Sequence, residues 1–186
     1  VNEETLPAAV AGLKTCGIRG FNLTMPNKNK IVELLDELSP EAQLIGAVNT
    51  VLNDNGKLIG YNTDGYGFMQ SVRDAGHDIT GKNITVMGVG GASMAICAQS
   101  ALDGAASVHI FARRTSRYWN RTQKFAENLS AKTGCQVCLF DNDDHTALRD
   151  SIAQSYLLIN ATSVGMVPDI DDTIIKDTSL FHPELV

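Results

Sequence analysis

A glycine-rich turn between an apolar run and a helical pattern constrains the fold of this chain more than any other feature. The turn follows residues 84–87 and reads Gly88, Val89, Gly90, Gly91, Ala92 and Ser93. Gly88 permits a tight turn, and Gly90 lacks a side chain, so the backbone can approach a phosphate there. The helix that follows offers free N–H groups and the positive end of its dipole. We therefore expect residues 88–92 to bind a pyrophosphate.

Short apolar runs alternate with helical patterns around and beyond this turn. The runs are 84–87, 108–111, 137–140 and 156–160. Strands that alternate with helices are typical of a parallel sheet with right-handed crossovers. We predict a Rossmann-like, doubly wound parallel α/β sheet over residues 67–186, preceded by a smaller α/β domain over residues 1–66.

The smaller domain contains a strong hairpin signal. Asn55-Gly56 lies between the apolar pairs 51–52 and 58–59, which predicts a two-residue turn. In that register Asn49 faces Asn62, and Asp64 is a diagonal neighbour of Asn49, roughly 7–8 Å away. That separation suits two groups that bind one small hydroxylated molecule.

Helices are predicted around this hairpin. One covers residues 6–17, and Ser39-Pro40 supplies a cap and a first position for a short one. Between them a helix is expected from about residue 28. Its apolar face is formed by residues at three- and four-residue spacing, namely Ile31, Leu34, Leu35 and Leu38.

Composition excludes several classes of protein. Hydrophobic residues make up 44% of the chain, which is enough for a packed core. The net charge of -6 and the lack of a basic stripe argue against a nucleic-acid partner, and no apolar run is long enough to cross a bilayer. Four cysteines are too few for a disulfide scaffold, which favours a reducing, cytoplasmic setting. Cys135 and Cys138 form only half of a zinc-ribbon spacing, so no metal site is expected.

The tip of the second predicted strand discriminates between dinucleotides. It reads Ala112, Arg113, Arg114 and Thr115, and no acidic residue follows until Glu127. An acid at this tip binds the ribose hydroxyl of NAD, whereas arginine suits the additional phosphate of NADP. The sequence therefore favours NADP, and NAD stays open as the alternative.

The chain resembles the shikimate/quinate dehydrogenase family. The matching segments are Asn-Leu-Thr-Met-Pro-Asn-Lys at 22–28, Ala-Val-Asn-Thr at 47–50, Gly-Tyr-Asn-Thr-Asp-Gly at 60–65, Gly-Val-Gly-Gly-Ala at 88–92 and Asn-Ala-Thr-Ser-Val-Gly-Met at 160–166. They occur in the order and spacing of the family across nearly the whole chain. The chain differs from the family at the cofactor loop, where Ala112 replaces an Asn and Thr115 stands where quinate-accepting members often have Asp.

This resemblance implies an NAD(P)-dependent oxidoreductase that interconverts shikimate, or quinate, and its 3-dehydro form. It implies that Lys28 and Asp64 are the catalytic pair, and that Asn22, Thr24 and Asn49 bind the substrate hydroxyls beside them. Ser163 and Met166 would lie near the nicotinamide. Family elements that would lie before Val1 and after Val186 are missing. The resemblance therefore implies that residues 1–66 are part of a smaller α/β substrate domain and that residues 67–186 are a dinucleotide-binding domain truncated at its C-terminal end.

The expected partners are a small cyclic polyol carboxylate and, as one option, a second copy of the chain in a homodimer. Two alternatives accompany the dehydrogenase reading. A catalytically silent nucleotide-sensing domain would keep the fold but usually loses the Lys or the Asp, and both are present here. A methylene-folate or tRNA-linked reductase would lack the joint pattern around Lys28 and Asp64.

Overall fold

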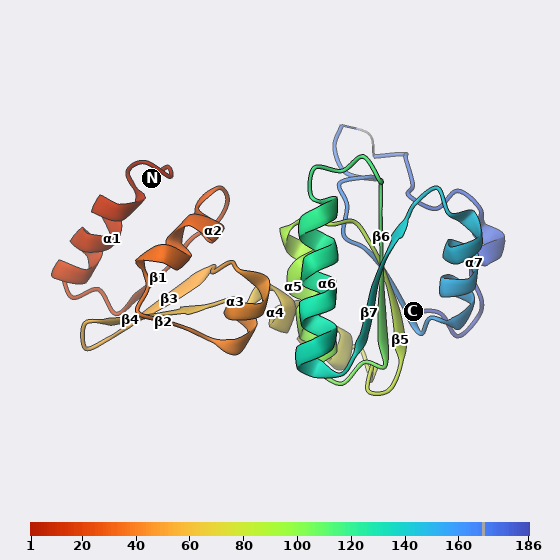
Figure 1. The fold of residues 1–186 in the computed structure, drawn as a ribbon, viewed down its shortest axis with the longest axis horizontal. Helices are drawn as coiled ribbons and strands as arrows, with labels where there is room; N and C mark the ends of the chain where they lie inside the picture. Colours follow the sequence, from red (N-terminus) through yellow and green to blue (C-terminus); the bar gives the residue numbers. More distant parts are fainter. Residues whose placement is uncertain (169) are drawn as a thin grey trace. The chain divides into compact units, whose positions relative to one another are not determined.

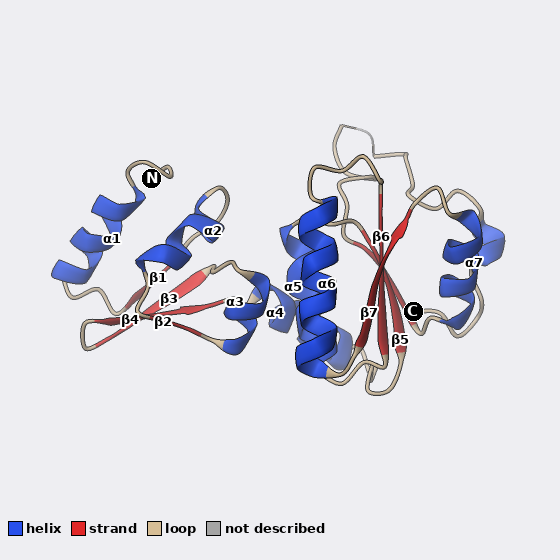
Figure 2. Ribbon diagram, viewed as in Figure 1, coloured by secondary structure: helices blue, strands red, loops and turns tan. Residues whose placement is uncertain are grey.

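The structure is a computed structural model that describes residues 1–168 and 170–186. The chain divides into two compact units, Val1–Gly67 and Phe68–Val186 (Figures 1 and 2). Each unit has its own sheet of four strands. Among the described residues, no helix combines the length and the apolar character needed to span a membrane.

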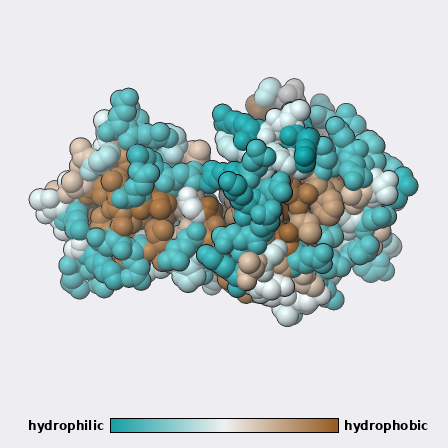
Figure 3. Space-filling view, in the orientation of Figure 1, coloured by the Kyte–Doolittle hydropathy of each residue, from teal (hydrophilic) through white to brown (hydrophobic). Residues whose placement is uncertain are grey.

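The first unit is a small α/β domain. Its elements are α1 (Leu6–Thr15), β1 (Gly20–Asn22), α2 (Asn27–Lys30), the 3-10 helix η1 (Ile31–Leu34), β2 (Glu37–Leu38), α3 (Pro40–Ile45), β3 (Thr50–Asp54) and β4 (Lys57–Tyr61). The strand order is β1-β3-β4-β2, and only the β2–β4 pairing is parallel. α4 (Asp64–Asp74) begins in this unit and continues into the second. Brown, apolar side chains of the first unit gather over its sheet in Figure 3.

The predicted hairpin is confirmed. Asp54 pairs with Lys57, and the pairing of Thr50 with Tyr61 continues the same register. Asn55 has φ 52° and Gly56 has φ 91°, so both turn residues adopt the left-handed conformation that this tight turn requires. The Ser39 cap is also confirmed, because its hydroxyl accepts the N–H of Ala42.

The predicted helix from residue 28 to Leu38 is wrong in its second half. Helical backbone ends at Leu34, Leu35 is extended, and β2 then pairs with β4. The Asp36 carboxylate accepts the N–H of Leu58 at 2.7 Å, so the segment is held to the edge of the sheet. The apolar residues of the pattern, namely Ile31, Leu34, Leu35 and Leu38, still pack in one core. The spacing thus reflects burial shared by a helical turn and a strand.

The second unit is the expected doubly wound parallel sheet. Its strands are β5 (Asn83–Met87), β6 (Ser107–Ala112), β7 (Gln136–Asp141) and β8 (Leu157–Asn160), in the order β7-β6-β5-β8. All of the pairings in this sheet are parallel. Its main helices are α5 (Gly91–Leu102), α6 (Trp119–Thr133) and α7 (His145–Gln154), and η2 (Thr178–Leu180) follows. Figure 1 shows α5 and α6 on one face of the sheet and α7 on the other.

A chain of buried hydroxyl groups joins the sheet to α7. The Ser155 hydroxyl donates to the Ser151 carbonyl at 2.9 Å, so it can only accept from Thr85 at 2.6 Å. Thr85 must then accept from the Ser151 hydroxyl at 2.6 Å, and Ser151 must accept from Nδ1 of His109 at 2.9 Å. The proton order is therefore fixed, and the Nδ1 atom of His109 carries a hydrogen. Burial lowers the pKa of His109, which favours its neutral form.

The four cysteines are free thiols. Cys16 is exposed, Cys138 is partly exposed, and the other two are buried. Burial raises the pKa of Cys97 to about 12 and that of Cys135 to about 11. Within the described part of the chain, no three His, Cys, Asp or Glu side chains are grouped so that they could hold a metal ion.

Candidate functional site

The structure brings Lys28 and Asp64 together. Lys28 lies in α2, and Asp64 is the first residue of α4. The Lys28 ammonium donates to Asp64 Oδ2 at 2.6 Å, and 20% of the Lys28 side chain is exposed. The Lys28 carbonyl accepts the N–H of Val48 at 2.8 Å, which ties α2 to the segment that leads into β3. The pair is therefore partly sheltered and anchored by regular backbone structure.

Asn49 completes a cluster around the carboxylate. Its amide donates to Asp64 Oδ1 at 2.8 Å, so both oxygens of Asp64 are occupied. The prediction that Asp64 continues the strand as a diagonal neighbour of Asn49 is wrong. The reason is that the chain leaves the strand after Tyr61 and turns into α4 at Asp64, where the Asp64 N–H bonds to the Asn62 side chain.

Asn22 joins the cluster through a residue that the sequence did not single out. The Asn22 amide donates to the Thr50 hydroxyl at 2.9 Å, and that hydroxyl donates to Asn49 Oδ1 at 3.0 Å. Asn22 and Thr50 are paired residues of β1 and β3, so the sheet register predicts this contact once the pairing is known. Among the described residues the Thr24 hydroxyl has no hydrogen-bond partner, although its carbonyl accepts the N–H of Asn27.

This cluster combines groups that can handle a proton with groups that can hold an alcohol. The ammonium of Lys28 can donate, the carboxylate of Asp64 can accept, and the amide of Asn49 fixes the orientation of that carboxylate. The structure thus places four of the five predicted substrate-site residues in one hydrogen-bonded series. Their catalytic and binding roles stay predictions.

Two glycines of the glycine turn have different structural roles. Gly88 has φ 110°, and a Cβ on it would lie 2.9 Å from the Ala161 carbonyl oxygen. A Cβ at Gly90 would meet nothing within 4 Å, so that position opens onto free space. Ser93, the last residue of the glycine turn, is fully buried and donates to the Gly88 carbonyl at 2.6 Å. This hydrogen bond closes the turn on its buried side and leaves the open side at Gly90 free.

The start of α5 fits a phosphate. Gly90 occupies the N-cap position, and no side chain caps the first turn of this helix. The N–H groups at such a helix start lack intrahelical acceptors and face the positive end of the dipole. The open space at Gly90 therefore lies where the free N–H groups and the helix dipole would most stabilise a bound anion.

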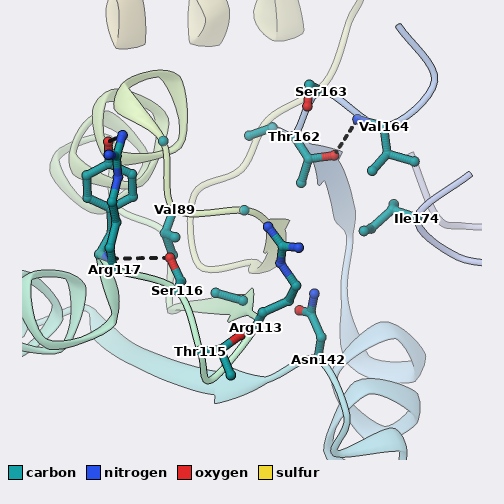
Figure 4. A pocket seen from close by; sticks show the side chains of 15 residues that line it. Val89, Arg113, Thr115, Ser116, Arg117, Asn142, Thr162, Ser163, Val164 and Ile174 are labelled. Atoms are coloured by element: carbon teal, nitrogen blue, oxygen red, sulfur yellow. Dashed lines mark hydrogen bonds between the residues drawn. The ribbon is translucent and has the colours of Figure 1, made fainter. Parts of the chain in front are cut away.

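A cavity of about 900 Å³ extends from this turn across the carboxyl ends of the strands (Figure 4). It is lined by Gly88, Val89, Gly90, Ala112, Arg113, Thr115, Ser116, Arg117, Tyr118, Asn142, Ala161, Thr162, Ser163, Val164 and Ile174. Seven of the predicted cofactor residues are among them, namely Gly88, Val89, Gly90, Ala112, Arg113, Thr115 and Ser163. This volume is within the range of small-molecule and cofactor sites.

Four predicted cofactor residues do not line this cavity. Gly91 and Ala92 lie in the first turn of α5. The Arg114 guanidinium stacks on the ring of Trp119, 4.6 Å from its centroid, which turns it toward α6. Met166 is 63% exposed in the segment after β8.

Sequence reasoning missed several lining residues. Arg117 stacks on the ring of Tyr118 at 4.7 Å and bonds to its hydroxyl at 2.6 Å. Asn142 follows β7, and its N–H donates to the Ala112 carbonyl at 2.9 Å. The signal for Asn142 was available, because the carboxyl ends of parallel strands meet at one edge of a sheet where ligands bind.

Comparisons of the sequence and of the fold with known proteins find shikimate and quinate dehydrogenases among the similar proteins. Residues 1–51 match the shikimate dehydrogenase substrate binding domain. A shikimate dehydrogenase (NADP(+)) of Listeria innocua is 46% identical over 186 residues, which are 100% of this chain and 64% of that relative. A quinate/shikimate dehydrogenase of Escherichia coli is 41% identical over the same share of each chain.

Solved structures agree. The crystal structure of shikimate 5-dehydrogenase from Listeria monocytogenes in complex with shikimate and NAD matches with a TM-score of 0.97 and 45% identity. The match covers 100% of this chain and 64% of the chain of that structure. The resemblance to the shikimate/quinate dehydrogenase family is confirmed. Quinate dehydrogenase from Corynebacterium glutamicum in complex with NAD has a TM-score of 0.80 at 29% identity, covering 95% and 60% of the two chains. The chain spans 64% of the length of the curated relatives it matches.

Proposed function

We propose that this chain is part of an NAD(P)-dependent dehydrogenase that interconverts shikimate, or quinate, and its 3-dehydro form. The observation that carries the proposal is the Lys28 ammonium held on Asp64 at 2.6 Å, with Asn49 on the other carboxylate oxygen. Family relatives named shikimate dehydrogenase (NADP(+)) and quinate/shikimate dehydrogenase support the substrate class, a small cyclic polyol carboxylate.

The Lys28–Asp64 pair would manage the proton of the reacting hydroxyl. A bound nicotinamide supplies the acceptor or donor of the hydride. In the oxidation direction the pair takes the hydroxyl proton as the carbonyl forms, and in reduction it returns that proton to the developing alkoxide. Asn22, Thr24 and Asn49 would orient the hydroxyl groups, because their amide and hydroxyl groups can both donate and accept. Such positioned acid–base groups contribute about 10²–10⁴-fold in rate.

The cavity at the glycine turn would hold the dinucleotide. Residues 88–92 would bind the pyrophosphate, and Ser163 and Met166 would lie toward the nicotinamide. Arg113, which lines the cavity, favours NADP because a guanidinium suits a phosphate monoester. Solved relatives in complex with NAD keep that cofactor as the alternative. A cytoplasmic location, in keeping with the free cysteines, and a homodimer belong to the same proposal.

Kinetics of paired lysine variants test the catalytic assignment. In the whole protein, Lys28→Ala should lower turnover by about 10²–10⁴-fold and leave dinucleotide affinity largely unchanged, because the lost group acts on the proton and not on the cofactor. Lys30→Ala is the matched control, since Lys30 lies in the same helix but pairs with Glu33 at 2.8 Å. Turnover is followed by the absorbance of the reduced cofactor, with shikimate and quinate each against NAD and NADP.

The results separate the two candidate functions. Normal turnover of Lys28→Ala would overturn the assignment of the pair. Dinucleotide binding by the wild-type protein without turnover of either substrate would favour the nucleotide-sensing alternative. The intact Lys28–Asp64 contact argues against that alternative, because a silent domain has no need to maintain it.

A further inference from the structure

Asn142 has an unusual side chain for its position. Three buried side-chain oxygen or nitrogen atoms lack a hydrogen-bond partner in the part of the chain that the structure describes: Asn27 Oδ1, Trp119 Nε1 and Asn142 Oδ1. Only Asn142 among them lines the cavity. Its backbone is fixed by the bond from its N–H to the Ala112 carbonyl, one position beyond the last β6–β7 pair. The unpaired amide is therefore held in a defined place.

An unpaired buried acceptor destabilises the protein that contains it. Leaving such a group without a partner costs about 1–3 kcal/mol, and an apolar side chain of similar size would avoid that cost. Positions where a sequence breaks such a rule are commonly functional. The amide of Asn142 is thus better explained by a ligand that pairs with it than by the stability of the free protein.

The position of Asn142 in the sheet indicates which part of the ligand it would contact. The pyrophosphate belongs at Gly88–Gly90, and the adjoining ribose belongs at the tip of β6, beside Arg113. Asn142 follows β7, the strand beyond β6 in the sheet order β7-β6-β5-β8. Figure 4 shows the Asn142 and Arg113 side chains directed into the cavity, with Ile174 as an apolar neighbour along its wall. The next group of a dinucleotide after that ribose is the adenine.

The chemistry of the amide fits a base better than a phosphate. A phosphate monoester is mostly dianionic at neutral pH and offers no hydrogen to Oδ1. Adenine offers a hydrogen on its exocyclic amine next to a ring nitrogen that accepts, and an Asn amide presents the complementary acceptor and donor. We propose that Asn142 recognises the adenine base of the dinucleotide through this pair of hydrogen bonds, an inference that rests on the proposed function.

Binding measurements without turnover test this inference. Isothermal titration calorimetry would compare NAD and NADP with their etheno-adenine derivatives, in which a two-carbon bridge joins the exocyclic amine to ring N1 and removes the hydrogens of that amine. The wild-type protein should bind the unmodified cofactor at least about tenfold more tightly, within the roughly 5–150-fold that one to three kilocalories per mole represent. Asn142→Ala should reduce this preference to less than about threefold, because the amide and its steric limit are both removed.

Two further variants guard against a trivial loss of folding. Asn142→Leu keeps the branched shape of the side chain and removes the unpaired acceptor, so the free protein should unfold at the same or a higher urea concentration while its preference for unmodified adenine is lost. Asn128→Ala is the matched control, since Asn128 is exposed on α6 and should leave the preference unchanged.

The outcomes distinguish this inference from the function on which it rests. Equal preference for unmodified adenine in the wild type and in Asn142→Ala, with tight binding in both, would overturn the inference alone. A wild-type protein that binds neither NAD nor NADP would overturn the proposed function, and the inference with it.

Discussion

Thr85→Val should destabilise the second unit although it changes the shape of the core very little. Thr85 is fully buried and forms two hydrogen bonds of 2.6 Å at the centre of the hydroxyl chain. Valine is close to threonine in volume, so no cavity term is expected. The fixed proton order means that the Ser151 hydroxyl loses its only acceptor, and a buried donor left unpaired costs about 1–3 kcal/mol.

The protein contains a built-in probe for this experiment. Its single tryptophan, Trp119, is buried at the start of α6, so its fluorescence reports unfolding of the second unit. At a denaturant slope of about 2 kcal/mol per molar urea, a loss of about 2 kcal/mol lowers the midpoint by about 1 M. Thr146→Val is the control, because Thr146 is exposed on α7 and surface changes stay within about 0.5 kcal/mol. Equal midpoints for the two variants would refute the ordered chain of hydrogen bonds.

Two further predictions concern the cores. Burial lowers the pKa of His109, so below about pH 6.5 the unfolded state binds more protons than the folded state, and stability should fall as the pH falls. His109→Asn should reduce this slope in urea titrations between about pH 5 and pH 8, and an unchanged slope would contradict the assignment. Gly60→Ala should destabilise the first unit by about 1–3 kcal/mol, since overpacking is costly and the new Cβ would lie 2.5 Å from Leu35 Cδ1. Gly12→Ala, which meets nothing within 4 Å, is its control in circular dichroism melts and should be neutral or stabilising.

Features that depend on neighbouring residues were predictable from the sequence. The turn at Asn55-Gly56 needs positive φ at both positions, and the residue types state that requirement directly. The glycine turn before α5 and the alternation of strands and helices are local in the same sense. These signals were sufficient for the parallel sheet of the second unit and for the hairpin of the first.

Features that depend on distant partners were not predictable from local pattern. Residues 35–38 satisfy a helical spacing, but they leave the helix and lead into β2, because Leu58 and Gly60 offer backbone groups at the sheet edge. The hydrogen bond between Asn49 and Asp64 required knowledge of where α4 begins. Arg114 looked equivalent to Arg113 in the sequence, and only the position of Trp119 separates them.

The four thiols differ in their expected reactivity toward labelling reagents. Alkylating reagents attack the thiolate, and desolvation keeps Cys97 and Cys135 protonated far above neutral pH. Cys16, exposed just after α1, should therefore react ahead of both, with partly exposed Cys138 as its competitor. Replacing that competitor by serine would leave a native, single attachment point for a dye or spin label on the small N-terminal unit, without introducing any new cysteine.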